Sequence, residues 1–330
     1  MGRMTRYDAD TRVDGGSTSC DGPRTLLLEP RKVPLGGIRA MDVSRSLPQR
    51  DLPLVGAWCF LDRFGPQVAM MRVDPHPHIG LQTVTWPLVG EVHHRDAVGS
   101  DVVITRGQLN IMPAGAGISH SEYSVGDEPG PIDALQLWIA LPEGARHQDP
   151  HFEQHRALPS ARLTATEGAD PSVTVVVGSF AGVTSPAAVY TPIMGAEISL
   201  APGSRVRLPF VPDWEYAIVH VDGDVTVHDG ADGFPLQQLD LLYLGVHRDG
   251  IEVSSQGGAM IFLLGGEPFG EEIIMWWNFV GRSHEEIVEA REQWEAHDPR
   301  FGSVPGHDRD DRTPAPPLPN VRLTTRKRRV

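Results

Sequence analysis

Short apolar runs separated by turn-forming residues fill the middle of the sequence and constrain its fold more than any other feature. The runs are rich in branched and aromatic side chains, and Gly, Pro or Asp bounds them. The 35 Gly and 29 Pro are spread along the 330 residues rather than gathered in repeats. We therefore predict many short strands, few helices and an all-β fold. The clearest candidate strands are residues 81–88, 102–105, 134–141, 173–177, 217–221 and 260–264.

One helix is expected near the C-terminal end. Ser283 is followed three residues later by Glu286, which is the pattern of a capping box. Ile287, then Ala290 or Arg291, and then Trp294 recur at helical spacing. They form one apolar stripe that can dock on a sheet.

A weak internal repeat indicates two copies of one barrel. Residues 88–92 resemble residues 221–225, because in both an apolar run enters a Gly-acid turn and leaves through Val. Further along, residues 110–115 resemble residues 240–245. Hairpins also resemble one another by chance, but two tandem barrels fit the length of the chain.

These patterns predict four parts of the chain. They are a disordered, Gly/Ser-rich arm (1–24), an N-terminal barrel (25–155), a C-terminal barrel ending in the helix (156–302) and a flexible, Pro-rich, basic tail (303–330).

Charge and composition exclude several classes of function. The net charge is −14, from 29 Lys and Arg against 43 Asp and Glu, which disfavours direct contact with nucleic acid or anionic lipid. Two cysteines cannot build a disulfide framework or a Cys-rich metal site. The sequence has no apolar run typical of a signal peptide or long enough to span a membrane, so we expect a cytoplasmic protein.

Two pairs of alternating polar residues are the candidate metal ligands. Along an extended strand, residues i and i+2 face the same side, about 6–7 Å apart, so His76 and His78 can both point into a barrel. His120 and Glu122 repeat this spacing 42 residues after His78. If the two strands lie side by side, three nitrogens and one carboxylate surround one point. Taken alone, His-Pro-His fits a structural or solvent-facing pair equally well.

The chain resembles the pirin family of bicupins from about residue 31 to residue 294. The resemblance rests on Phe60-Leu61-Asp62-Arg63-Phe64-Gly65-Pro66, Asp74-Pro75-His76-Pro77-His78, Gly90-Glu91-Val92-His93-His94-Arg95-Asp96, Pro113-Ala114-Gly115-Ala116-Gly117-Ile118-Ser119-His120-Ser121-Glu122, Gly265-Gly266-Glu267-Pro268 and Trp277-Asn278-Phe279-Val280-Gly281-Arg282-Ser283.

This resemblance implies two tandem cupin barrels, each a jelly roll or double-stranded β-helix. It places His76, His78, His120 and Glu122 at the positions of the family's four metal ligands. The family usually binds iron. Several bacterial members open the flavonol quercetin with dioxygen, and animal relatives are described as iron-dependent transcription cofactors.

The first departure from the wider cupin pattern is at Gln82, where that pattern has Glu. Because Glu122 already supplies a carboxylate, we expect Gln82 to hydrogen-bond near the metal and tune it without binding it.

The second departure lies in the repeat. Pro209 and Val211 stand where the first barrel has its His-Pro-His pair, and Gly250 falls opposite His120, although Glu252 falls opposite Glu122. We therefore expect a metal-free second barrel and one metal per chain.

The leading functional hypothesis is an iron(II)-dependent dioxygenase that cleaves a flavonol with O2. The ligand set also suits manganese, nickel, copper or zinc. Glu122 is the candidate base for the substrate hydroxyl. Candidate pocket walls are Phe60, Phe64, Met112 and Trp138. His93 and His94, beside the turn at Gly90, are expected to face solvent, and the alternative is a hydrogen bond near the metal.

Two alternatives stay open. One is a non-catalytic, metal-dependent redox sensor that binds a regulatory protein, and the other is a metal-free barrel that binds a sugar-like or lipid-like molecule.

Overall fold

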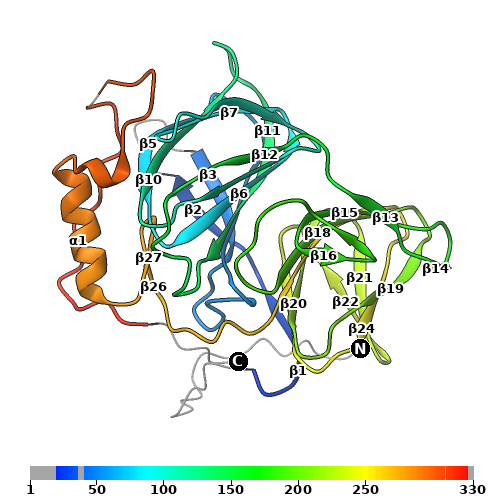
Figure 1. The fold of residues 1–330 in the computed structure, drawn as a ribbon. Helices are drawn as coiled ribbons and strands as arrows, with labels where there is room; N and C mark the ends of the chain where they lie inside the picture. Colours follow the sequence, from blue (N-terminus) through cyan, green and yellow to red (C-terminus); the bar gives the residue numbers. More distant parts are fainter. Residues whose placement is uncertain (1–19, 36–40, 309, 326–330) are drawn as a thin grey trace.

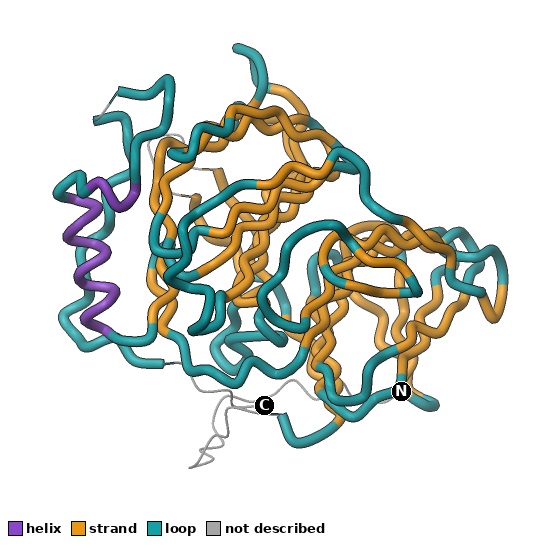
Figure 2. Tube along the Cα trace, viewed as in Figure 1, coloured by secondary structure: helices purple, strands orange, loops and turns teal. Residues whose placement is uncertain are grey.

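The computed structural model describes residues 20–35, 41–308 and 310–325, and it shows two β-barrels side by side (Figure 1). The all-β prediction and the tandem cupin architecture are confirmed, with one α-helix against a background of strands (Figure 2). Residues 1–19 of the predicted arm and the predicted basic cluster at 326–329 lie outside the described residues. No helix of the described residues is both long and apolar enough to cross a membrane.

The first barrel consists of two antiparallel sheets. A seven-stranded sheet has the order β12-β9-β6-β11-β4-β3-β2, and a four-stranded sheet has the order β5-β10-β7-β8. The strands are β2 (Arg31–Leu35), β3 (Met41–Leu47), β4 (Trp58–Ala69), β5 (Arg72–His78), β6 (Leu81–Val89), β7 (Glu91–Asp96), β8 (Asp101–Thr105), β9 (Leu109–Pro113), β10 (Ile118–Ser124), β11 (Gly130–Ala140) and β12 (Glu153–His155).

The second barrel repeats this plan. Its sheets have the orders β1-β23-β20-β25-β18-β15-β13 and β14-β19-β24-β21-β22. The strands are β1 (Pro23–Leu28), β13 (Ser160–Arg162), β14 (Ala165–Glu167), β15 (Ser172–Val177), β18 (Ile193–Leu200), β19 (Arg205–Pro209), β20 (Glu215–Gly223), β21 (Val225–Asp229), β22 (Asp232–Leu236), β23 (Leu241–Gly245), β24 (Gly250–Ser254) and β25 (Ala259–Gly266), with a small hairpin of β16 (Ser179–Phe180) and β17 (Val183–Thr184).

The first strand of the described residues belongs to the second barrel. β1 pairs antiparallel with β23, with Leu26 opposite Tyr243 and Leu28 opposite Leu241. The prediction that the N-terminal barrel begins at residue 25 is therefore wrong for this strand. The physical reason is that β1 covers an edge of the second barrel's sheet, while Leu26 and Leu28 pack against the core between the barrels.

The predicted helix, α1 (His284–Glu295), forms as expected but docks on the first barrel (Figure 1). The Glu286 N–H donates to Ser283 Oγ at 3.2 Å, which confirms the cap. Ile287 and Trp294 of the apolar stripe lie in one cluster with Ile79 of the first barrel. β26 (Ile274–Trp276), β27 (Phe279–Gly281) and the 3-10 turn η1 (Pro299–Phe301) contribute to this cluster. The end of the predicted second barrel thus covers the first.

The chain after residue 302, which we expected to form a flexible tail, lies along α1 as far as residue 325. Ala315 is buried in the same cluster, and the Trp294 indole N–H donates to the Thr313 carbonyl at 3.0 Å. The Thr313 N–H in turn donates to the carbonyl of Pro75 in β5 at 2.9 Å. This segment therefore braces a strand that carries two candidate ligands.

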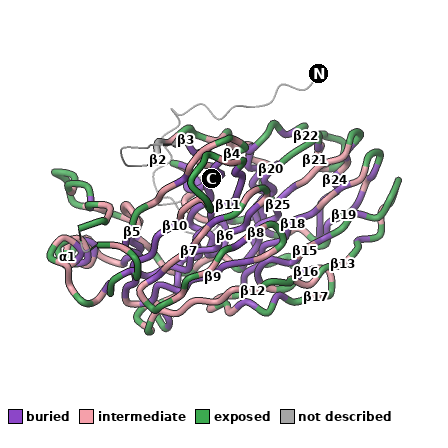
Figure 3. The backbone as a smooth tube through the Cα atoms, turned by 90° about the horizontal axis from the view of Figure 1, so that it is seen from above, coloured by how far each residue is buried: buried purple, intermediate pink, exposed green. Residues whose placement is uncertain are grey.

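The two barrels share a core. Figure 3 shows buried positions along the strands where the barrels meet, and one apolar cluster contains Trp58 and Phe262 from opposite barrels. The Trp58 indole N–H donates to the Met194 carbonyl at 3.0 Å. Arg63 binds the Asp133 carboxylate and also donates to the Val221 carbonyl at 2.6 Å. Burial and buried polar contacts thus hold the barrels as one body.

Ala315→Asp tests whether the segment after residue 302 is packed. A carboxylate at this buried position would lie among apolar side chains and near the Glu295 carboxylate, which accepts from the Ala315 N–H, so we expect the free energy of unfolding to fall by about 1–3 kcal/mol in denaturant titrations. Asn320→Asp adds the same charge at an exposed position and should change little. If both substitutions left the free energy of unfolding unchanged, the segment after residue 302 would be a flexible tail, as the sequence predicts.

Candidate metal centre

Strand pairing brings the predicted ligands to one place inside the first barrel. β10 lies between β5 and β7 in the four-stranded sheet. His76 of β5 stands directly opposite His120 of β10, and His94 of β7 stands opposite Glu122. A bulge between His120 and Glu122 shifts the pairing with β5. The predicted alternation of side chains therefore produces a convergent set rather than two separate pairs.

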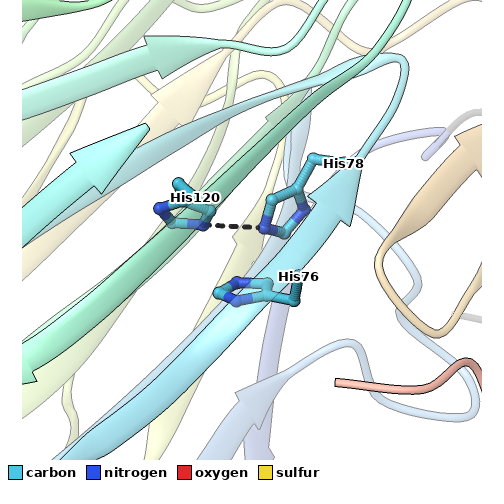
Figure 4. Close-up of side chains that lie close together, drawn as sticks. All are labelled: His76, His78 and His120. Atoms are coloured by element: carbon cyan, nitrogen blue, oxygen red, sulfur yellow. Dashed lines mark hydrogen bonds between the residues drawn. The ribbon is translucent and has the colours of Figure 1, made fainter. Parts of the chain in front are cut away.

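Three of the four predicted ligands form a compact, buried group of imidazoles. The ligand atoms of His76, His78 and His120 all lie within 4.8 Å of one another. The Nε2 atoms of His78 and His120 are 3.1 Å apart, and the His76 ring lies beneath them (Figure 4). Each of the three side chains is buried.

Glu122 lies in a second group that shares His120. The ligand atoms of His94, His120 and Glu122 are also within 4.8 Å of one another. Glu122 is buried, and its Oε1 accepts a hydrogen bond from Thr85 Oγ1 at 3.2 Å. The four predicted ligands therefore occupy two overlapping triads around a common histidine.

Main-chain carbonyls fix the protonation of two of the imidazoles. His76 Nδ1 lies 3.0 Å from the Asp74 carbonyl, and His78 Nδ1 lies 3.2 Å from the Asn278 carbonyl. A carbonyl oxygen only accepts, so each Nδ1 carries the proton and each Nε2 presents a lone pair. For His78 this lone pair faces His120.

Burial sets the charge of the group. It lowers the pKa of His76 to about 4, and together with the neighbouring histidines it holds the pKa values of His78 and His120 well below 6.5. Burial raises the pKa of Glu122, against the opposing effects of His94 and Thr85. All four side chains thus favour their neutral forms. A divalent cation would fit here, because it would bind neutral imidazoles and restore the carboxylate charge.

Two of the four predicted pocket residues adjoin this group. Phe60 and Trp138 stack with ring centroids 3.9 Å apart, and the Trp138 ring meets His78 edge to face at 5.2 Å. Phe64 and Met112 lie in two other apolar clusters of the same barrel.

The structure corrects the role expected for Gln82. Its Nε2 donates to the Ala188 carbonyl at 3.1 Å, and Val84 and Trp86 on the same side of β6 lie in the core between the barrels. Side chains alternate along a strand, so Gln82 faces away from the metal ligands and Thr85 faces them. Because residue 82 lies on the opposite face of β6 from the ligands, its side chain cannot hydrogen-bond near the metal.

His94 was expected to face solvent but is only 2% exposed. Its ring stacks on Phe152 with centroids 4.6 Å apart, and its Nδ1 lies 3.3 Å from His120 Nδ1. Alternation along β7 buries Val92, His94 and Asp96, whereas His93 contacts Asp101 on the outside. The apolar residue Val92, two positions earlier, was the signal that could have identified His94.

The second barrel has no ligands at the positions that the sequence repeat indicates. Pro209 stands opposite Gly250 but is exposed, whereas the next pair along these strands, Leu208 and Ile251, is buried in the apolar core. Glu252 forms an ion pair with Arg205 at 2.8 Å. Among the described residues, both groups of side chains that could hold a metal ion lie in the first barrel.

Comparison with known proteins identifies both halves of the chain. A family model described as Pirin matches residues 40–139, and one described as Pirin C-terminal cupin domain matches residues 195–302. A Pseudomonas aeruginosa protein named as a candidate quercetin 2,3-dioxygenase is 42% identical over 88% of this chain and 89% of its own length. A pirin-like protein of Caulobacter vibrioides is 34% identical over 82% of this chain and 93% of its own.

A solved structure supports the same relationship. The crystal structure of a quercetin 2,3-dioxygenase from Acinetobacter baumannii has a TM-score of 0.82 at 38% identity, and the match covers 92% of this chain and 98% of that one.

The depressed pKa values predict how pH affects the metal-free protein. A histidine titrates near pH 6.5 in an unfolded chain, whereas His76 titrates at about 4 in the folded barrel. Between these values the unfolded chain binds more protons, so the free energy of unfolding falls as the pH decreases. His78 and His120 act in the same direction, and Glu122, with its raised pKa, opposes them at acidic pH. We expect a lower melting temperature at pH 5.5 than at pH 7.5.

Circular dichroism of metal-free protein measures this difference. His76→Asn removes one of the three buried imidazoles with a lowered pKa and should make this difference smaller. If the variant showed the same difference as the wild type, the buried imidazoles would not be its source.

Proposed function

Because the chain belongs to the pirin family of two-barrel cupins, we propose that it is a metal-dependent dioxygenase acting on a quercetin-like flavonol. The metal would be held by His76, His78, His120 and Glu122, with one ion per chain. The name of the Pseudomonas relative and that of the Acinetobacter structure support the reaction class.

The proposal rests mainly on the buried histidine nitrogens that lie close together inside the first barrel with lone pairs available for a metal. The carbonyls of Asp74 and Asn278 bind Nδ1 of His76 and His78 and leave both Nε2 lone pairs available, and that of His78 faces His120. Fixing the other ring nitrogen in this way is how proteins orient metal-binding histidines. Apolar filling would serve a purely structural barrel better, since unpaired buried nitrogens destabilise it.

Iron(II) is the metal we propose. Three imidazoles and a carboxylate suit iron, and manganese, nickel, copper and zinc accept the same donors. When bound, the metal supplies a Lewis acid that favours the ionised form of a substrate hydroxyl, together with the redox chemistry that O2 requires.

The chain's own groups would then position the substrate and accept its proton. Glu122 would receive the proton of the flavonol hydroxyl, because it is the carboxylate that lies within the buried group of ligands. The Thr85 hydroxyl orients that carboxylate. The stacked rings of Phe60 and Trp138 offer a flat apolar wall beside His78 for an aromatic substrate.

His120→Ala tests the assignment of the ligands. Since His120 belongs to both triads, its loss should reduce bound iron from one per chain to well below one, as measured by elemental analysis. His220→Ala is the matched control, because His220 is an equally buried histidine of the second barrel. Wild-type iron content in His120→Ala would refute the assignment.

Glu122→Gln tests the proton acceptor. Glutamine keeps the size of the side chain and can still accept from Thr85, but it cannot take the substrate proton. We expect oxygen uptake with quercetin to fall by about 10²–10⁴-fold per bound iron. An iron-loaded wild-type protein that consumes no oxygen with any of a panel of flavonols would instead favour a non-catalytic, metal-dependent binding protein.

A further inference from the structure

A buried hydrogen-bonded chain extends from His120 away from the other ligands. His120 Nδ1 lies 3.3 Å from His94 Nδ1, and His94 Nε2 lies 3.1 Å from Asp96 Oδ2. The second carboxylate oxygen, Asp96 Oδ1, accepts from the backbone N–H groups of Val98 and Ser100 at 3.0 and 2.9 Å. Asp96 is completely buried, so the chain ends at a fixed anchor.

With His94 neutral, these hydrogen bonds allow one placement of their protons. Burial would raise the pKa of Asp96, but hydrogen bonds from His94 and Ser100 outweigh it and lower the pKa, so the carboxylate is ionised. An ionised carboxylate only accepts, so His94 carries its proton on Nε2 and accepts at Nδ1. His120 must then carry its proton on Nδ1, which leaves the Nε2 lone pair directed at His78.

His120 differs in this respect from its partners. His76 and His78 are oriented by backbone carbonyls, which no substitution removes. For His120 the corresponding partner is a side chain, itself held by Asp96 and by stacking on Phe152. The tautomer of the one histidine common to both triads therefore depends on residues that substitution can test.

We propose that His94 and Asp96 are positioning residues that hold His120 in the tautomer and ring orientation required for metal binding. The inference rests on the proposed function only in requiring a metal at His120. Partners of this kind affect metal affinity by about 10–100-fold in known metal sites. It also gives His94 a role distinct from that of a ligand, although His94 lies close enough to Glu122 to be one.

Asp96→Asn reverses the donor and acceptor roles in the hydrogen bonds that link residues 96, 94 and 120, and it leaves no cavity because the two side chains have the same size. Asparagine keeps its Oδ1 on the N–H groups of Val98 and Ser100, and so presents its NH2 group to His94. His94 then accepts at Nε2 and carries its proton on Nδ1, facing the N–H of His120. Two donors oppose each other, and His120 has to rotate or change tautomer.

At position 94, a pair of substitutions separates the hydrogen bond from packing. In His94→Asn the amide oxygen can take the place of Nδ1 and accept from His120. His94→Leu is of similar size and accepts nothing. His93→Asn and Asp101→Asn are matched controls, because this pair lies next to His94 and Asp96 on the outer face of the same hairpin.

The test uses cobalt(II) as the metal. Its affinity is measured by competition with a chelator, and paramagnetic proton NMR follows the exchangeable N–H protons of the imidazoles. We expect Asp96→Asn and His94→Leu to bind cobalt about 10–100-fold more weakly and to lose or shift one N–H resonance. His94→Asn should stay within a few-fold of wild type, and the two outer controls should match it. Melting curves of the metal-free variants verify folding, and either inner variant suffices if the other fails to fold.

Three outcomes would overturn the inference. In the first, Asp96→Asn and His94→Leu bind as tightly as wild type with an unchanged spectrum. In the second, His94→Asn is as weak as His94→Leu, which would make His94 a ligand. In the third, the wild type binds no cobalt, and the proposed function then fails together with the inference.

Discussion

The antiparallel pairing of β5 with β10 is the constraint on which the rest of the structure depends. It sets His76 against His120 and fixes which side chains enter the barrel. A slip of one residue would turn the histidines outward, because side chains alternate along a strand. Contacts on the outer face secure the register: Ser119 Oγ donates to the Phe301 carbonyl at 2.9 Å, and Pro75 accepts from Thr313. The outward residues of these strands thus hold the inward ones in place.

The second barrel supports the site although it lacks the ligands. Its interior is filled by an apolar cluster that includes Val206, Leu208 and Ile251, so the space that holds imidazoles in one copy holds a hydrophobic core in the other. The chain that leaves this barrel returns to the first and supplies the Asn278 carbonyl behind His78. The second barrel therefore contributes a stable apolar scaffold, and the segment that follows it contacts the site in the first barrel.

Local patterns in the sequence were enough to predict the strands, the helix and the convergence of His76, His78 and His120. Each of these features depends on the spacing of residues close together in the sequence, which can be read without knowing the fold. The docking of β1 and of α1 could not be predicted, since their apolar faces fit either barrel and only three-dimensional packing selects one. Gln82 and His94 were misplaced for another reason: family likeness and proximity to a turn were given more weight than the two-residue alternation of the strands.

The exchange of chain ends between the barrels has a consequence for biogenesis. β1 precedes the first barrel in the chain but pairs with the second, and the helix that covers the first barrel follows the second in the chain. The carbonyl behind His78 also comes from this later segment. During synthesis, the first barrel can therefore gain its covering helix and this carbonyl only after the second barrel has been made.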